Sequence, residues 1–258
     1  MAKSKLLKEL VNNEVSLLQA MDRLYLIAYS LHDDDICAWI KKEKSGYDSN
    51  DNIPPFRKTT VIPIGTYQIH SAGKIETYND TPLPTHGVPD DVKKQFDNWY
   101  VRDSVVSLEK QKELANEGHR AGFPLDPICF RWFEKGTNIL MRKAMLCISP
   151  LSIETILCSV KMAVIDLLLL YESNFGELDN LDIDLQEHKT EEINEIKTIS
   201  KSIINGSFNG KTKIVIKNSN LGQGNSINKE ANISVTATVE KKEKKPFFKW
   251  LRSIFRKK

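Results

Sequence analysis

Apolar residues recur at helical intervals over residues 3–44. The Ser-Leu-Leu-Gln motif at residues 16–19 matches a capping box, in which the serine and glutamine side chains satisfy free amide groups at a helix start. The helix that follows is apolar on almost every side, which is typical of a helix buried inside a bundle. A further helix is expected to open at Asp33 or Asp34 and to end at Gly46. The beginning of the chain is therefore predicted to be a helical bundle.

The pattern changes in residues 47–90, where prolines alternate with short runs of β-branched residues. Proline is excluded from helix interiors and β-branched residues favour extended backbone, so this segment is predicted to be a small irregular lobe with edge strands. Helical spacing returns over about residues 90–117 and ends at Gly118. After a proline-broken apolar stretch, the Ser-Pro pair at residues 149–150 is predicted to begin another helix.

This last helix is apolar enough to be compared with a membrane-spanning segment. Its apolar stretch from Ile156 to Tyr171 has only 16 residues and contains Lys161 and Asp166. A membrane span needs about 20 predominantly apolar residues, and charged residues are rare within it. The stretch is therefore predicted to be a core helix.

Two segments of distinct composition follow the core helix. Residues 176–204 are rich in acids and keep isoleucines at near-helical spacing, which predicts an acidic helix or linker with one packing edge. Residues 205–240 are rich in Asn and Gly, and residues 233–239 alternate with the period of a strand. This β segment is interpreted either as a hairpin or tether, or as strands that stack between copies and form a homo-oligomer.

Together these patterns predict a mainly α fold with a small irregular β lobe, an α+β class. The expected organisation is a helical N-terminal domain over residues 1–175 that carries a β-containing insert at residues 47–90. The acidic helix or linker at 176–204, the short C-terminal β segment at 205–240 and a terminal amphipathic helix at 241–258 complete the chain.

Positive charge is concentrated in the tail, residues 241–258. The whole chain has a net charge of +3, and the tail carries nine Lys/Arg against one acid, Glu243. The tail therefore has a net charge of +8, which leaves a net charge of −5 on residues 1–240. A mildly acidic body is not expected to bind nucleic acid through a broad basic face.

The tail also has the pattern of an amphipathic helix. With Pro246 as the first helical residue, its apolar side chains fall within an arc of about 160°, opposite its cations. About 13 helical residues span roughly 20 Å, too short to cross a bilayer, so the tail is predicted to lie on an anionic membrane surface. Packing on the protein's own body and binding of nucleic acid are the alternatives. The apolar residues are Phe247, Phe248, Trp250, Leu251, Ile254 and Phe255, and the cations are Lys249, Arg252 and Arg256.

Motifs for catalysis and metal binding are weak. The four cysteines lie far apart without histidines at ligand spacing, so no metal site, disulfide framework or cofactor is expected. Residues 206–212 resemble a phosphate-binding loop, but three residues separate the glycines instead of four, and a strand pattern follows. No arginine is followed after four to six residues by a histidine, a spacing common among ribonuclease toxins.

The densest group of aromatic and polar residues lies around the end of the helix that closes at Gly46. One interpretation is a small-ligand pocket, with Glu43 and Arg57 as its polar groups and aromatic walls. The other is a buried ion pair with aromatic packing, which fixes the junction between the helix and the lobe. The group consists of Trp39, Glu43, Gly46, Tyr47, Pro55, Phe56 and Arg57.

These same residues carry a resemblance to a known family. The pattern Trp-Ile-x-x-Glu-x-x-Gly-Tyr at residues 39–47, followed by Pro-Phe-Arg at residues 55–57, is similar to the AbiTii domain family of bacterial abortive-infection proteins. Residues 101–105 and the helix at residues 160–172 follow in the order expected for that family. The resemblance covers about residues 5–175.

The resemblance implies defence against phage, by a toxin or effector that halts the host cell after a phage-derived trigger of unknown chemistry. It implies no particular reaction. With the tail, it predicts an effector at the inner membrane surface that self-assembles through residues 205–240. The alternatives are an enzyme localised by the tail, either a nuclease or a nucleotide-directed hydrolase, and a non-toxic regulatory binding module. Because the N-terminus shows no secretory signal, the chain is expected in the cytoplasm, peripheral on the membrane.

Overall fold

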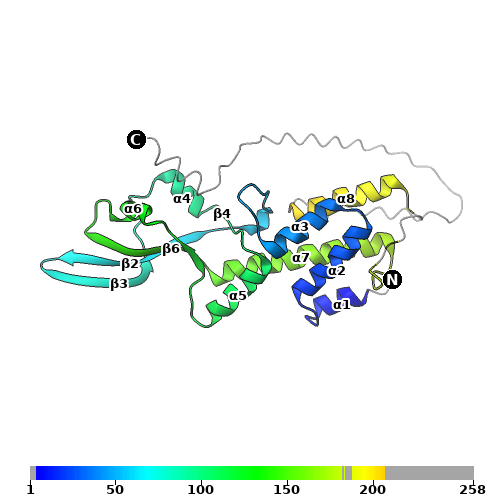
Figure 1. The fold of residues 1–258 in the computed structure, drawn as a ribbon, viewed down its shortest axis with the longest axis horizontal. Helices are drawn as coiled ribbons and strands as arrows, with labels where there is room; N and C mark the ends of the chain where they lie inside the picture. The colour runs from blue at the N-terminus through cyan, green and yellow to red at the C-terminus, as the bar shows by residue number, and fades with distance from the viewer. Residues whose placement is uncertain (1–3, 182, 184–187, 207–258) are drawn as a thin grey trace, which may run out of the picture.

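The computed structural model describes residues 4–181, 183 and 188–206. This part of the chain is elongated, with a bundle of helices at one end and a sheet flanked by shorter helices at the other (Figure 1). The helices are α1 (Lys5–Val11), α2 (Leu17–Ser30), α3 (Asp34–Ser45), α4 (Asp90–Phe96), α5 (Val105–Asn116), α6 (Phe130–Glu134), α7 (Pro150–Phe175) and α8 (Thr190–Ile204), with short 3-10 helices η1 (Pro55–Arg57) and η2 (Pro127–Cys129). The strands are β1 (Lys58–Thr59), β2 (Val61–Ser71), β3 (Lys74–Pro82), β4 (Trp99–Tyr100), β5 (Gly122–Pro124) and β6 (Ile139–Ile148).

The helical end follows the local signals in the sequence. The predicted capping box is present, because the Ser16 hydroxyl accepts from the Gln19 amide at 3.2 Å and the Gln19 side chain accepts from the Ser16 amide at 3.0 Å. The Asp33 carboxylate caps α3, and Gly46 ends that helix with a φ of 92°. Ser149 caps α7, which begins at Pro150 as predicted.

The sheet end is larger and more regular than the irregular lobe predicted for residues 47–90. Four antiparallel strands pair in the order β3-β2-β6-β5, and β6 comes from residues 139–148, which were not expected to form a strand. Pro63 is compatible with β2 because its carbonyl accepts from the Leu83 amide at the end of the β2–β3 ladder. The N–H and C=O of one residue point to the same side of a strand, so the missing proline N–H faces the β3 side, beyond the last pair of Ile64 with Pro82, while β2 continues to pair with β6 through Pro63. The α+β class is confirmed.

The continuous helix predicted over residues 90–117 is wrong, because the chain forms α4, then β4, then α5. Strand β4 pairs with β1, where Lys58 lies opposite Tyr100. The Val101 amide donates to the Arg57 carbonyl at 2.9 Å, so this segment is held extended against η1. These non-local hydrogen bonds outweigh the local helical spacing.

Two hydrophobic cores share α7. Ile153 and Ile156 pack in the core beneath the sheet, whereas residues from Val160 to Tyr171 pack among the helices α1, α2, α3 and α8. The predicted core helix is therefore confirmed. In the part of the chain that the structure describes, no helix combines the length and the apolarity needed to cross a membrane.

Helix α8 has the single packing edge that its sequence predicts. Ile196, Ile203 and Ile204 are buried, while Glu191 and Glu192 in its first turn are exposed. The predicted β segment at residues 205–240, apart from its first two residues, and the predicted tail helix at 241–258 lie outside the described residues.

Candidate functional site

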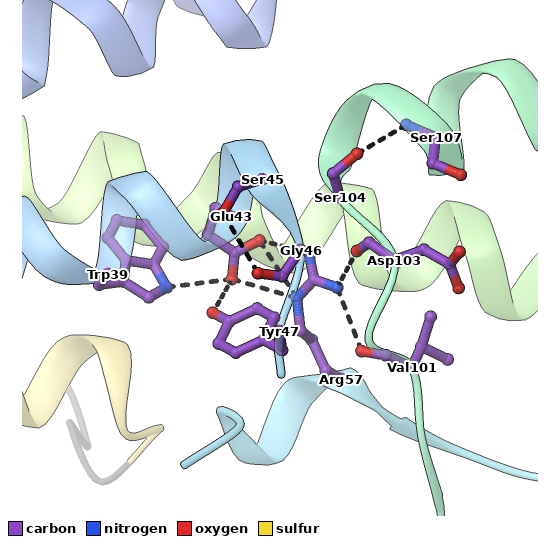
Figure 2. A network of polar contacts seen from close by, with 10 residues as sticks. All are labelled: Trp39, Glu43, Ser45, Gly46, Tyr47, Arg57, Val101, Asp103, Ser104 and Ser107. Carbon is purple, nitrogen blue, oxygen red and sulfur yellow. Dashed lines mark hydrogen bonds and ion pairs between the residues drawn. The ribbon is translucent and has the colours of Figure 1, made fainter. Parts of the chain in front are cut away.

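The predicted group of aromatic and polar residues meets where α3, η1 and the segment before α5 come together (Figure 2). Four of its members form one hydrogen-bonded unit, named here the Glu43–Arg57 cluster: Trp39, Glu43, Tyr47 and Arg57. Trp39 and Glu43 are one helical turn apart on α3, so their side chains share a face. Tyr47 follows the glycine that ends α3, and Arg57 is the last residue of η1.

The Glu43 carboxylate accepts hydrogen bonds from three side chains. Its Oε1 accepts from Trp39 Nε1 at 3.0 Å, from the Tyr47 hydroxyl at 2.7 Å and from Arg57 Nε at 3.1 Å. Its Oε2 accepts from Arg57 Nε at 3.1 Å and also from Arg57 Nη2. Both oxygens are therefore occupied by donors from within the chain.

Each nitrogen of the Arg57 guanidinium also donates within the chain. Beyond the paired contact with Glu43, its Nη1 donates to the Val101 carbonyl at 3.2 Å and to the Asp103 carbonyl at 2.6 Å. Its central carbon lies 4.9 Å from the centre of the Tyr47 ring, a cation–π distance. Arg57 thus ties η1 to α3 on one side and to the segment that leads into α5 on the other (Figure 2).

Solvent does not reach the charged pair. Glu43 and Arg57 each have 0% exposure, and the rings of Trp39 and Tyr47 are buried around them. Removing one member of such a pair would leave an uncompensated buried charge, which costs about 3–5 kcal/mol. Burial, the nearby Glu43 charge and its hydrogen bond raise the pKa of the Tyr47 hydroxyl far above its usual range, so Tyr47 stays protonated and donates.

Gly46, Pro55 and Phe56, the other predicted members, shape the backbone and the packing. A Cβ on Gly46 would lie 3.0 Å from the Arg102 carbonyl oxygen, and its φ of 92° disfavours any other residue. Pro55 begins η1 and sets the turn that presents Arg57. Phe56 packs, half-buried, on the core of the helical end.

The arrangement is suited to fixing structure. A catalytic carboxylate needs a free oxygen within reach of a substrate, and a ligand-binding guanidinium needs free N–H groups. Both oxygens of Glu43 already accept hydrogen bonds from within the chain, and the N–H groups of Arg57 donate to Glu43 and to two backbone carbonyls. Of the two interpretations of this group, the geometry favours the buried ion pair at the junction between helices and sheet.

Sequence reasoning did not identify the carbonyl acceptors of Val101 and Asp103, because backbone groups leave no side-chain signal. Two other buried polar contacts were also missed. The Glu172 carboxylate accepts from the amide and hydroxyl of Ser4, and Asp33 accepts from the Tyr171 hydroxyl at 3.1 Å. For Glu172 the sequence signal is a lone acid at the end of an apolar helical pattern, whereas Asp33 is one of three consecutive acids and is not singled out for this contact.

Metal-ligating side chains do not gather in the described residues, where no three His, Cys, Asp or Glu lie together as possible ligands. The predicted membrane-binding residues of the tail, Phe247 to Arg256, lie outside the described residues.

Comparison with known proteins assigns a family. The family model described as AbiTii matches residues 4–197, a range that contains the whole Glu43–Arg57 cluster and reaches into α8. Neither the curated proteins nor the solved structures gave a match. Since the matched range covers most of its length, the chain belongs to the AbiTii family, and this membership suggests an abortive-infection role against phage.

Proposed function

We propose that this protein is an anti-phage effector of abortive infection that acts at the inner surface of the cell membrane, where its C-terminal tail binds anionic lipid. The main support for this proposal is the composition of residues 241–258, which combine nine Lys/Arg with six large apolar residues after Pro246. Each Lys or Arg close to an anionic leaflet contributes roughly 1 kcal/mol of attraction. Aromatic residues add the apolar contact that holds an amphipathic helix in the headgroup region.

The geometry of the Glu43–Arg57 cluster supports separate roles for the folded body and the tail. Its charged groups are buried and satisfied internally, which supports a structural role for the family pattern at residues 39–57. The effector activity is therefore assigned to the tail, helped by self-assembly through residues 205–240, whose alternating strand pattern favours stacking between copies.

Membrane binding is tested by flotation of the full-length protein with anionic and neutral vesicles. The wild type should float with vesicles that contain phosphatidylglycerol and should stay behind with phosphatidylcholine alone. Trp250→Glu places an acid on the apolar arc and should abolish flotation. Ser253→Glu adds the same charge outside that arc and should retain most of it. Equal flotation of the two variants, or a wild type that ignores both vesicle types, would contradict the proposal.

Effector action is tested by induced expression while growth and membrane potential are followed. The wild type should stop growth and depolarise the membrane, and Trp250→Glu should do neither, whereas Ser253→Glu should resemble the wild type. A wild type that leaves growth unaffected would point to a regulatory binding module. Growth arrest that persists in Trp250→Glu would point to an activity independent of the tail.

A further inference from the structure

An open apolar groove runs along the outer face of α7, between η1 and the end of α8. Its volume is about 480 Å³. Leu151, Cys158 and Met162 of α7 line its length, and Phe56 and Gly206 lie on its walls. This feature is called the α7 groove below, and α7 and α8 can be followed in Figure 1.

The groove leaves large apolar side chains in water. Leu151 is 72% exposed and Met162 is 53% exposed, although the opposite side of α7 is packed in both cores. The lining residues of α7 repeat every three or four positions from Leu151 to Asp166, so they form one stripe about 22 Å long. A stripe of this kind is the surface that an amphipathic helix packs against.

Acidic groups sit within the same stripe. Asp166 is half-buried, and burial raises the pKa of its carboxyl; among the described residues no hydrogen bond or ion pair is found for it. Glu154 has one neighbouring cation, Lys112, at 2.9 Å on an exposed part of the surface. The groove therefore offers apolar contacts together with negative charge, which suits an occupant with an apolar face and basic residues.

The chain supplies such an occupant next to the groove. Gly206, which lines the groove, is the last residue that the structure describes, and residues 207–245 separate it from Pro246. A connection of 39 residues reaches up to about 130 Å when extended, far more than the groove requires. A helix over residues 246–256 would be roughly 16 Å long, which fits within the stripe.

We propose that the α7 groove binds the chain's own segment 246–256, with Trp250 and its apolar neighbours on Leu151 and Met162 and the tail cations near Asp166 and Glu154. The apolar face used here is the one assigned above to the membrane, so the two bound states exclude each other. Regulation by the groove rests on the proposed function, whereas binding of the tail in the groove does not. Without lipid the tail stays bound in the α7 groove, and its displacement from the groove makes it available to bind the membrane.

Cys158 reports occupancy of the groove, because its thiol is exposed there in the described residues. The rate of its alkylation in the full-length protein is measured by mass spectrometry without lipid, with half-buried Cys147 of β6 as the internal reference. Cys158 should react about tenfold faster in Trp250→Glu than in the wild type, because the tether keeps the wild-type tail at a high effective concentration near the groove. Cys147 should react equally in both proteins, and Ser253→Glu should leave Cys158 protected.

The regulatory consequence is tested from the groove side. Met162→Lys adds a positive charge to the groove and should repel the tail, so a larger fraction of the protein should float with anionic vesicles than for the wild type. Leu26→Lys is the matched control, because Leu26 is 49% exposed on α2, away from the groove. It should leave flotation unchanged.

Three outcomes decide the proposal. Equal Cys158 alkylation in the wild type and Trp250→Glu would overturn it. Protection that disappears on dilution would also overturn it, since the occupant would then be the tail of a second copy. Protection that persists on dilution while no variant floats would support the groove and contradict only the membrane proposal.

Discussion

The Glu43–Arg57 cluster and the α7 groove lie close along the molecule, since η1 contributes Arg57 to one and Phe56 to the other. In the cluster, charges are buried and every strong contact is internal. In the groove, apolar side chains are exposed, and the half-buried carboxylate of Asp166 has no hydrogen-bond or ion-pair partner among the described residues. Internal satisfaction is typical of groups that determine stability, whereas unsatisfied surface is typical of groups that recognise a partner.

The contrast separates two kinds of mutational effect. Changes in the cluster should lower the free energy of unfolding strongly and alter function only through folding. Changes in the groove should leave stability almost untouched and alter the distribution of the tail between body and membrane. The four predictions below test this separation, from the largest expected loss of stability to the smallest.

Glu43→Gln should cause the largest loss. It keeps the shape of the side chain but leaves Arg57 buried without a counter-charge, so the free energy of unfolding should fall by about 3–5 kcal/mol in urea titrations. Glu154→Gln, on the exposed surface of α7, should change it by less than about 0.5 kcal/mol. A Glu43→Gln protein with wild-type stability and no effect on growth would instead support the enzyme alternative.

Gly46→Ala should lower the free energy of unfolding by about 2 kcal/mol, because the alanine must adopt a φ of 92° and its Cβ must lie 3.0 Å from the Arg102 carbonyl oxygen. Gly73→Ala is the control. Gly73 has a φ of 77° in the β2–β3 turn, but a Cβ there would meet nothing within 4 Å. Gly46→Ala should therefore have the lower thermal midpoint, and equal midpoints would show that the contact with Arg102 has no cost.

Tyr47→Phe should cost about 1 kcal/mol, since it removes one donor to the buried Glu43 carboxylate while Trp39 and Arg57 remain. Tyr78→Phe removes a similar hydroxyl, which donates to Glu76 at 2.8 Å on the exposed part of the sheet. Its stability in the same urea titration should match the wild type. A larger loss for Tyr78→Phe would reverse the expected order of buried and exposed hydrogen bonds.

Met162→Lys should have the smallest effect on folding, within about 0.5 kcal/mol of the wild type, because this side chain is more than half exposed. The same urea titration checks it. Combined with increased vesicle flotation, unchanged stability would separate recognition from folding. A loss comparable to that of Glu43→Gln would show that the groove is part of the core after all.

Local signals predicted the helices of the helical end well, but they predicted the sheet and the segment over residues 90–117 poorly. Asp33, Gly46 and Ser149 act within a few residues of their own position, so their roles can be found without knowing the fold. Strand β6 was missed because Arg142 and Lys143 are exposed next to each other at a register shift, which interrupts the alternation that marks a strand. Its residues pair with residues of β2 that lie at least 70 positions away in the sequence, and local periodicity carries no information about such pairs.

The candidate site shows the same limit. The proximity of Glu43 and Arg57 was predicted from the density of aromatic and polar residues around them, and the structure brings them together. Their burial and the carbonyl partners at Val101 and Asp103 depend on how β4 and the start of α5 fold back over η1. The α7 groove had no sequence signal either, because Leu151 and Met162 read as ordinary members of an apolar helix.

The length of α7 has a thermodynamic consequence. Its 26 residues extend about 39 Å, and its side chains change from the sheet core to the helical core near Leu157, which packs on both. Neither core can open fully while this helix stays folded, and unwinding its middle, near Leu157, exposes apolar surface of both cores. The two cores should therefore unfold as one cooperative unit, with slow hydrogen exchange along the middle of α7 setting the limit for the whole molecule.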